Sequence, residues 1–320
     1  MTVVPVTPAA AAGAEQNTEG LQNAVLDLGF ENSLEDSSGK GNNGTLSSGE
    51  AEYVDGVVGK GLKMNGSSYV NLGNSTDLQP ENLTLSFWIR PDSDMKGEEL
   101  ISWNKNEWYT DGWYLSSEND NTPLTLSVGP AKTNGQPYRV SVSGKRSEFL
   151  PTGEWTHIAV TYDKDSKEIC FYRNGVKCST VTTYGISGES TGVLGSDASM
   201  EKSIGYNGPK YKGAYLKASL DEYQLYNDVA TQEEVIALYE ESGQTFDRKA
   251  VAQADLDKIS IPETTQGNLS LPATGESGSV ISWSSDNEAV VAADGTVVRP
   301  GVGEKLSLIH ISEPTRHSLI

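Results

Sequence analysis

The chain has 320 residues and a formal net charge of −20, and hydrophobic residues make up 36% of it. This acidic balance argues against nucleic acid as a partner, because phosphate groups are bound through Lys and Arg. No apolar run is long enough to span a membrane. The 33 glycines suit a globular chain rich in turns, and the length allows two domains.

The first 20 residues, MTVVPVTPAAAAGAEQNTEG, form a tail of small residues. Ala10 to Ala14 followed by Glu15 resembles the end of a secretion signal, but the tail has two prolines and no basic start. Residues 1–20 therefore have two interpretations, a clipped or mis-started signal and a disordered tail.

Residues 21–243 predict an all-β sandwich of short strands. Runs of β-forming residues are separated by Gly, Asn, Asp and Ser clusters, which is typical of a sandwich or barrel. The expected strands are residues 69–72, 83–89, 113–115, 124–128, 138–142, 156–162, 169–172 and 218–226. A short helix is expected after the last of them. Thr231 is its N-cap, Glu234 completes a capping box, and Gly243 is the stop.

Two cysteines, Cys170 and Cys178, flank the hairpin turn Asn174-Gly175. A two-residue loop would place Phe171 opposite Cys178 and point the two thiols to opposite faces. A three-residue loop would place Cys170 opposite Cys178. A disulfide between Cys170 and Cys178 is therefore expected in the second register and not in the first.

Residues 244–254 are polar without alternation and predict a linker. A second unit is expected over residues 255–305, with four short strands marked by Ile259, Ile261, Leu269, Leu271, Val280, Ile281, Trp283, Val290, Val297 and Val298. From residue 306 the chain reads LSLIHISEPTRHSLI, which breaks this pattern. We expect residues 306–320 to be a non-native tail and the chain to be an N-terminal fragment; a genuine divergent strand is the alternative.

Several motifs carry a resemblance to a known family. AVLDLGFENSLEDSSGKGNNGTL, GKGLKMNGSSYVNLG, LTLSFWIRPD, GEWTHIAVTYD, CFYRNGVKC and LDEYQLYN followed by TQEEVIALY occur in this order. Together they resemble a laminin-G-like (concanavalin A-like) jelly-roll domain over about residues 20–243. LSLP, ISWSSDN and DGTVVRP resemble the start of an atypical immunoglobulin-like domain of bacterial hydrolases that act on arabinan and related polysaccharides. The resemblance implies a jelly-roll sandwich followed by an incomplete immunoglobulin-like sandwich.

Catalysis is not expected within these residues. GxSxG, HExxH, P-loop and GxGxxG motifs are absent. His157, the one histidine before the tail, is expected to have a structural or surface role. The Glu-x-Asp-x-Glu strand of related glucanases is also absent. Asp221 and Glu222 are neighbours in a strand, so their side chains are expected on opposite faces.

Calcium is the cofactor that the resemblance implies. The jelly roll brings its first and last strands together, so Glu31 and Asp221 are expected to supply carboxylates and Asn43 an amide oxygen. The alternative is turn chemistry, in which Asp36, Ser37, Asn42 and Asn43 hold a tight loop. Both interpretations give a structural role.

Sugar binding is the ligand function that we expect. Sugar rings stack on exposed aromatic rings, and two polar loops carry such rings: Trp108 and Tyr109 in one, Tyr206 and Tyr211 in the other. The resemblance implies a monomeric, secreted accessory region that binds polysaccharide for an arabinan- or xylan-degrading hydrolase, whose catalytic domain would follow residue 320. The alternatives are an adhesion or protein-interaction module and a plain spacer.

Overall fold

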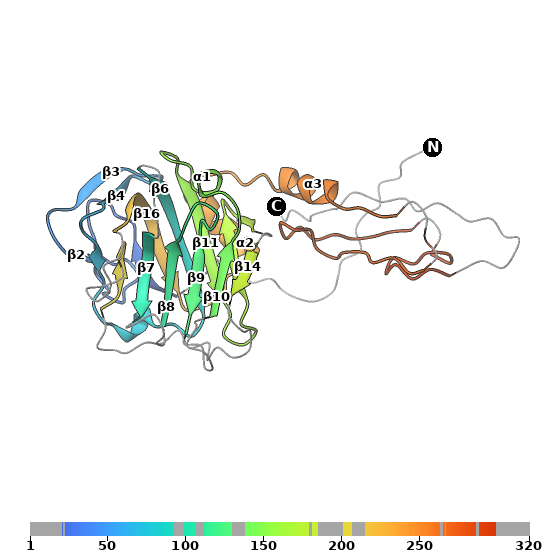
Figure 1. The fold of residues 1–320 in the computed structure, drawn as a ribbon, viewed down its shortest axis with the longest axis horizontal. Coiled ribbons are helices and arrows are strands. Elements are labelled where there is room, and N and C mark those ends of the chain that lie inside the picture. The colour runs from blue at the N-terminus through green and yellow to red at the C-terminus, as the bar shows by residue number, and fades with distance from the viewer. Residues whose placement is uncertain are drawn as a thin grey trace, which may run out of the picture.

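The computed structural model describes residues 21, 23–92, 99–105, 112–129, 138–178, 181–184, 201–206, 215–262, 265, 267–285 and 288–298. Two antiparallel sheets of eight strands each pack face to face and form the jelly roll (Figure 1). In the described part of the chain, no helix is both long and apolar enough to cross a membrane.

The first sheet has the strand order β13-β12-β11-β6-β16-β4-β3, and β1 also pairs with β16. Its strands are β1 (Ala24–Leu28), β3 (Glu52–Asp55), β4 (Lys60–Asn65), β6 (Leu83–Pro91), β11 (Thr156–Tyr162), β12 (Ile169–Arg173), β13 (Val176–Lys177) and β16 (Lys217–Tyr226).

The second sheet has the strand order β14-β10-β9-β8-β7-β15-β5-β2. Its strands are β2 (Thr45–Leu46), β5 (Val70–Asn71), β7 (Glu99–Lys105), β8 (Gly112–Ser117), β9 (Thr125–Val128), β10 (Tyr138–Val142), β14 (Val181–Tyr184) and β15 (Ser203–Ile204). Two short helices lie between strands, η1 (Thr76–Leu78) and α1 (Arg146–Phe149). The expected strands of residues 21–243 all overlap strands of the structure.

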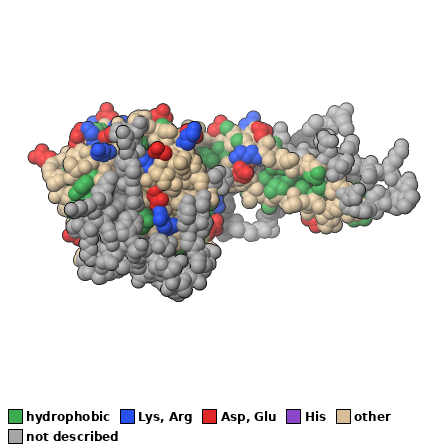
Figure 2. Space-filling model, viewed as in Figure 1, with side chains coloured by type: hydrophobic (Ala, Val, Ile, Leu, Met, Phe, Trp, Pro, Cys, Tyr) green, Lys and Arg blue, Asp and Glu red, His purple; other side chains and the backbone are tan. Residues whose placement is uncertain are grey.

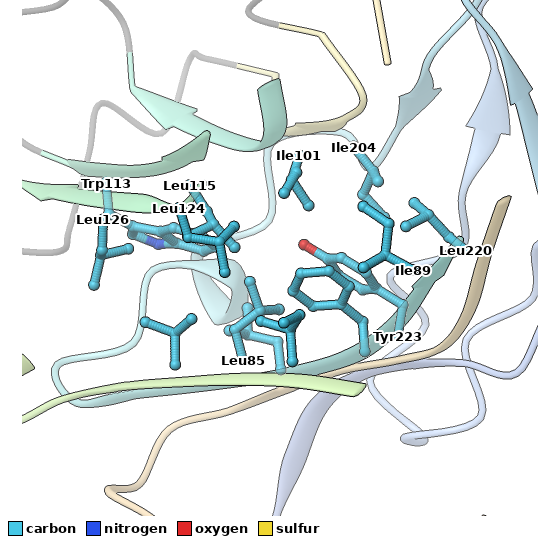
Figure 3. Packing of buried hydrophobic residues seen from close by; sticks show 14 of the residues in the cluster. Leu85, Ile89, Ile101, Trp113, Leu115, Leu124, Leu126, Ile204, Leu220 and Tyr223 are labelled. Carbon is cyan, nitrogen blue, oxygen red and sulfur yellow. The ribbon is translucent and has the colours of Figure 1, made fainter. Parts of the chain in front are cut away.

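The core lies between the two sheets, where alternate residues of each strand point inward. On β6 the inward residues are Leu83, Leu85, Phe87 and Ile89, all fully buried. They meet Trp113, Leu115 and Leu126 of the second sheet, and Leu124 just before β9 (Figure 3). Burying one such side chain contributes roughly 1.5–3 kcal/mol, so the jelly roll has a core large enough to fold around.

The helix that follows β16 is α2 (Gln232–Glu241). Its predicted capping box is confirmed: the Thr231 hydroxyl accepts from the Glu234 N–H at 3.3 Å, and the Glu234 carboxylate accepts from the Thr231 N–H at 2.7 Å. Gly243 follows with a φ of 78°, as expected for a stop. Val235 of α2 packs on Tyr172, on the face of the first sheet that is turned away from the core. We call this the outer face.

The hairpin between β12 and β13 has the two-residue loop. Asn174 and Gly175 have φ values of 49° and 78°. The Cys178 N–H donates a hydrogen bond to the Phe171 carbonyl at 2.8 Å, so these two residues face each other. Cys178 packs on the main core, whereas Cys170 packs under α2 on the outer face. This is the register in which no disulfide was expected, and both cysteines are free. The disulfide between Cys170 and Cys178 is therefore not formed in the structure.

The segment predicted as a linker contains most of a helix, α3 (Arg248–Asp257). Asp247 caps it by accepting from the Ala250 N–H at 2.9 Å, and this local cap allows a helix without an apolar stripe. Arg248 also holds α3 to α2, because its guanidinium forms two hydrogen bonds with the Glu240 carboxylate, at 2.7 and 3.1 Å.

The second unit differs from its prediction. Within its described residues, two isolated bridges replace the four expected strands, one from Thr274 to Val280 and one from Val291 to Val297. Val280 and Val298 are 62% and 55% exposed, and Figure 2 shows hydrophobic side chains gathered on this unit. Among its described residues the buried hydrophobic side chains are Leu269, Ile281 and Val291, a small core for regular strands.

Candidate functional site

The first candidate site lies where β16 changes neighbours. Residues 217–220 of β16 pair with β4, and residues 223–226 pair with β1. The loop between β3 and β4 closes the gap. Its Val57 and Val58 N–H groups donate to Asp221 Oδ2 at 2.7 and 3.0 Å, and the Lys60 N–H donates to Glu31 Oε1 at 3.0 Å. The structure therefore brings Glu31 and Asp221 to one loop, which agrees with the proximity that the resemblance implied.

A β-bulge at this point overturns the expected orientation of Glu222. The pairing of β16 with β6 shifts register between Asp221 and Gln224, and Glu222 has a φ of 46°. The extra residue breaks the two-residue alternation. Asp221 lies opposite Trp88, and Glu222 lines a pocket beside Trp88. Both carboxylates therefore lie on the outer face of the first sheet, and the prediction of opposite faces is wrong.

Burial raises the pKa of both carboxyl groups. For Asp221 the pKa is raised to about 6, against the opposing effect of its backbone hydrogen bonds. For Glu222 burial and the nearby charges of Asp221, Asp27, Glu31 and Glu241 raise the pKa to about 7. Every charge in this set is negative, so the site favours a cation or a proton.

Calcium suits part of this donor set. Carboxylate oxygens are the ligands that Ca²⁺ prefers, and Glu31 and Asp221 supply them. The backbone N–H groups of the loop already occupy lone pairs of both carboxylates. Within the described residues, no three His, Cys, Asp or Glu side chains are grouped as a metal site requires. Calcium binding stays a prediction.

Asn43 takes part in the neighbouring turn. Its amide oxygen accepts from the Asp36 N–H at 2.8 Å. The Asp36 carboxylate in turn accepts from the N–H groups of Asp27 and Asn42, at 2.9 and 2.8 Å. These contacts are the turn chemistry that was the alternative interpretation of this loop.

A pocket of about 80 Å³ lies between the outer face and α2. Its lining consists of Val58, Ser86, Trp88, His157, Glu222, Gln224, Leu238, Glu241 and Ser242. Ser86 Oγ and His157 Nε2 are 2.9 Å apart, the spacing of a serine and its base. Among the residues that the structure describes, none is a hydrogen-bond partner of His157 Nδ1, and burial lowers the His157 pKa to about 3. His157 is 1% exposed, so of the structural and surface roles expected for it, the structural one fits its burial.

The second candidate site is a cluster of three tyrosines. Tyr206 and Tyr215 stack with ring centroids 4.4 Å apart, and Tyr69 stacks on Tyr206 at 5.1 Å. Tyr206, a predicted ligand residue, is only 7% exposed, whereas Tyr69 and Tyr215 are partly exposed. The contact of Tyr69 with Tyr215 is not apparent from sequence, because 146 positions separate the two residues. Trp108, Tyr109 and Tyr211 lie outside the described residues.

Comparison with known proteins agrees with this architecture. The sequence matches the family model described as the concanavalin A-like lectin/glucanases superfamily over residues 64–236, and the chain belongs to this superfamily. Residues 249–311 match the model of an atrophied bacterial Ig domain, a range that includes the first part of the segment expected to be non-native. No curated protein matches the sequence.

Three solved structures illustrate the similarity. One is domain 4 of AbnA, a GH43 extracellular arabinanase from Geobacillus stearothermophilus, solved with arabinotriose. It is 22% identical to this chain with a TM-score of 0.50, and the match covers 69% of this chain and 100% of that one. The binding domain of Paraclostridial Mosquitocidal Protein 1 is 23% identical with a TM-score of 0.52, over 68% and 52% of the two chains.

The third is from a study of ganglioside-dependent cell entry of botulinum neurotoxin type C. It is 16% identical with a TM-score of 0.51, over 69% of this chain and 51% of that one. At these identities the similarity establishes the fold, which is shared by domains with different ligands.

Proposed function

We propose that this chain is a non-catalytic carbohydrate-binding region of a secreted bacterial polysaccharide-degrading hydrolase of the arabinan or xylan type. The tyrosine cluster carries the proposal. Tyr69 and Tyr215 present partly exposed rings beside Tyr206, and an aromatic ring with a hydroxyl offers an apolar face together with a hydrogen-bonding edge. This combination suits a sugar, which has apolar faces and hydroxyl edges.

The relatives support the same interpretation. The similar arabinanase domain was solved with arabinotriose and comes from an extracellular enzyme. An atrophied Ig domain also follows the jelly roll in this chain. A domain that holds polysaccharide raises the effective concentration of a linked catalytic domain at its substrate. The charge of −20 favours neutral polymers such as arabinan and xylan over anionic ones, because like charges repel.

Affinity electrophoresis of the full chain tests the proposal. We expect arabinan or xylan in the gel to retard the protein and polygalacturonate to leave its mobility unchanged. Tyr69→Ala with Tyr215→Ala should remove most of the retardation. Tyr53→Ala is the matched control, because Tyr53 is a partly buried tyrosine on β3 of the first sheet, outside the cluster. A second pair, Trp108→Ala with Tyr109→Ala, tests the loop predicted from the sequence.

A protein- or cell-binding module is the second candidate. The toxin structures among the similar proteins favour it. It predicts no retardation by any polysaccharide in a broad panel, and no effect of the tyrosine substitutions. That result would reject the accessory-region proposal.

A further inference from the structure

The backbone holds Tyr206 and Tyr215 side by side. The Leu216 N–H donates to the Gly205 carbonyl at 3.0 Å, so the stretch that follows β15 runs beside the stretch that precedes β16. Tyr206 and Tyr215 are the next residues along these two stretches. The Ser203 hydroxyl also donates to the Tyr206 carbonyl, which fixes the backbone at this point. Residues that face each other across such a pair keep their side chains within contact distance.

The rings of these two tyrosines are the closest and most nearly parallel of the tyrosine cluster. Their centroids are 4.4 Å apart and their planes differ by 7°. Tyr69 lies farther from both, at 5.1 Å from Tyr206 and 6.5 Å from Tyr215. Burial, the charge of Tyr215 and a hydrogen bond between the two side chains raise the pKa of Tyr206. The hydroxyl ends of the two rings therefore lie together, and the ring carbons beside them are near contact.

The cluster is open to an oxidant at its edge. Tyr69 and Tyr215 are partly exposed, whereas Tyr206 is 7% exposed. An oxidant at the surface therefore takes an electron from Tyr69 or Tyr215 first. Because both rings are stacked on Tyr206, the radical reaches Tyr206 through them and not through solvent.

We infer that Tyr206 and Tyr215 form an oxidative cross-linking site, at which hydrogen peroxide acting through a haem peroxidase joins the two rings as dityrosine. Each phenol gives up one electron and one proton. The peroxide takes up both electrons and both protons as its O–O bond breaks, and it leaves as two water molecules. The two radicals form a carbon–carbon bond between the ring carbons next to the hydroxyls. Each of these carbons then loses its hydrogen as a proton, and each phenol oxygen regains one.

The new bond has a structural consequence. It closes the short segment between Tyr206 and Tyr215 into a covalent loop and joins the end of β15 to the start of β16. A cross-link stabilises a fold mainly by restricting the unfolded chain. We therefore expect the linked protein to melt at a higher temperature than the unlinked one. This inference does not rest on sugar binding, and its test contains no sugar.

We would treat the full chain with hydrogen peroxide and a haem peroxidase and follow the blue fluorescence of dityrosine. The monomer band of a denaturing gel should fluoresce, and the mass of the monomer should fall by two hydrogen atoms. Trypsin should release residues 203–210 joined to residues 213–217, because cleavage at the flanking lysines leaves one tyrosine in each fragment. The fluorescence per chain should not change over about a hundredfold dilution, because the two rings are held in one molecule.

Tyr206→Phe and Tyr215→Phe keep the stacked rings but lack the hydroxyl from which the radical forms. Each should lower the fluorescence of the monomer about tenfold, because no other pair is held as closely in the cluster. Tyr53→Phe is the matched control and should keep the full signal, since Tyr53 is a partly buried tyrosine on β3. The inference is overturned by fluorescence confined to covalent dimers, by linked fragments that come mainly from another pair of tyrosines, or by an undiminished monomer signal in the Tyr206 and Tyr215 variants.

Discussion

Asp221 Oδ2 accepts a hydrogen bond from the Val57 N–H at 2.7 Å, which joins β16 to a loop 164 positions earlier. Val58 and Glu222 donate to the same carboxylate, at 3.0 and 2.9 Å. Asp221→Ala leaves these N–H groups without an acceptor. We expect the free energy of unfolding to fall by at least about 3 kcal/mol in urea denaturation, because each of the three unsatisfied donors costs roughly 1–3 kcal/mol.

Asp55→Ala is the control for that measurement. Asp55 lies just before the same loop, and its ion pair with Lys60 is at the surface, with the Asp55 side chain 92% exposed. Such pairs contribute at most about 1 kcal/mol. Equal losses in the two variants would show that Asp221 does not anchor the loop.

His157 should make stability depend on pH. Its pKa is about 3 in the folded protein and about 6.5 when unfolded, so the unfolded state binds more protons between these values. The contribution of His157 to the free energy of unfolding is fully present above about pH 6.5 and is lost as the pH falls. Its slope approaches about 1.4 kcal/mol per pH unit. His157→Gln, whose amide can replace the Nε2 contact with Ser86, should lack this loss.

Urea unfolding of both proteins at pH 7.5 and pH 5 measures the effect. Glu222 and Glu241 also face the pocket, and Asp221 lies beside it. The raised pKa values of Asp221 and Glu222 act in the opposite direction, stabilising the fold as the pH falls. They are present in both proteins, so the difference between the proteins isolates the histidine. Parallel pH profiles would contradict the prediction.

Gly278 is expected to be essential for the contact between the second unit and α2. Gln232 Nε2 donates to the Ser277 carbonyl at 2.7 Å. Gly278 has a φ of 88°, and a Cβ there would overlap the Gln232 side chain. Gly278→Ala should therefore break the contact and speed limited proteolysis between residues 244 and 258.

Gly267→Ala provides the comparison for the proteolysis experiment, since a Cβ at residue 267 meets nothing within 4 Å. It should digest at the rate of the unmodified protein, and the melting temperature of the jelly roll should be the same in both variants. Unchanged proteolysis of Gly278→Ala would mean that this contact does not restrain the joint.

Calcium is expected to raise the melting temperature, and EDTA to reverse the increase, if Glu31 and Asp221 hold the ion. Glu31→Gln should then reduce the increase. Asn43→Ala should lower the melting temperature equally with and without calcium, because Asn43 holds the Asp36 turn. A calcium effect that disappears in Asn43→Ala would instead support Asn43 as a ligand.

Both thiols are expected to be free but slow to react. Burial raises the pKa of Cys178 to about 12 and also raises that of Cys170, so little thiolate exists near neutral pH. A thiol reagent should react slowly with the native protein and modify two thiols per chain after denaturation without reductant. No reactive thiol in the denatured protein would demonstrate the disulfide.

Local sequence was enough for the features that depend on near neighbours. The strands were readable because apolar and polar residues alternate over runs such as residues 83–89, and the start of α2 because Thr231 and Glu234 cap each other. The calcium hypothesis also placed Glu31 near Asp221, because the resemblance supplied the pairing of first and last strands. Helix α3 was missed because its cap, Asp247, begins a polar segment with no apolar stripe.

Tertiary structure decided what depends on distant segments. The bulge at Glu222 arises where β16 exchanges β4 for β1, and alternation along one strand cannot reveal a change of partner. The same holds for the meeting of Tyr69 with Tyr215, and for the pocket that β16, β11 and α2 form together. Sequence pattern determined which residues enter the core. Only the packing of the sheet against α2 determined which polar residues face one another. Their contacts form through space, so they leave no period along the chain.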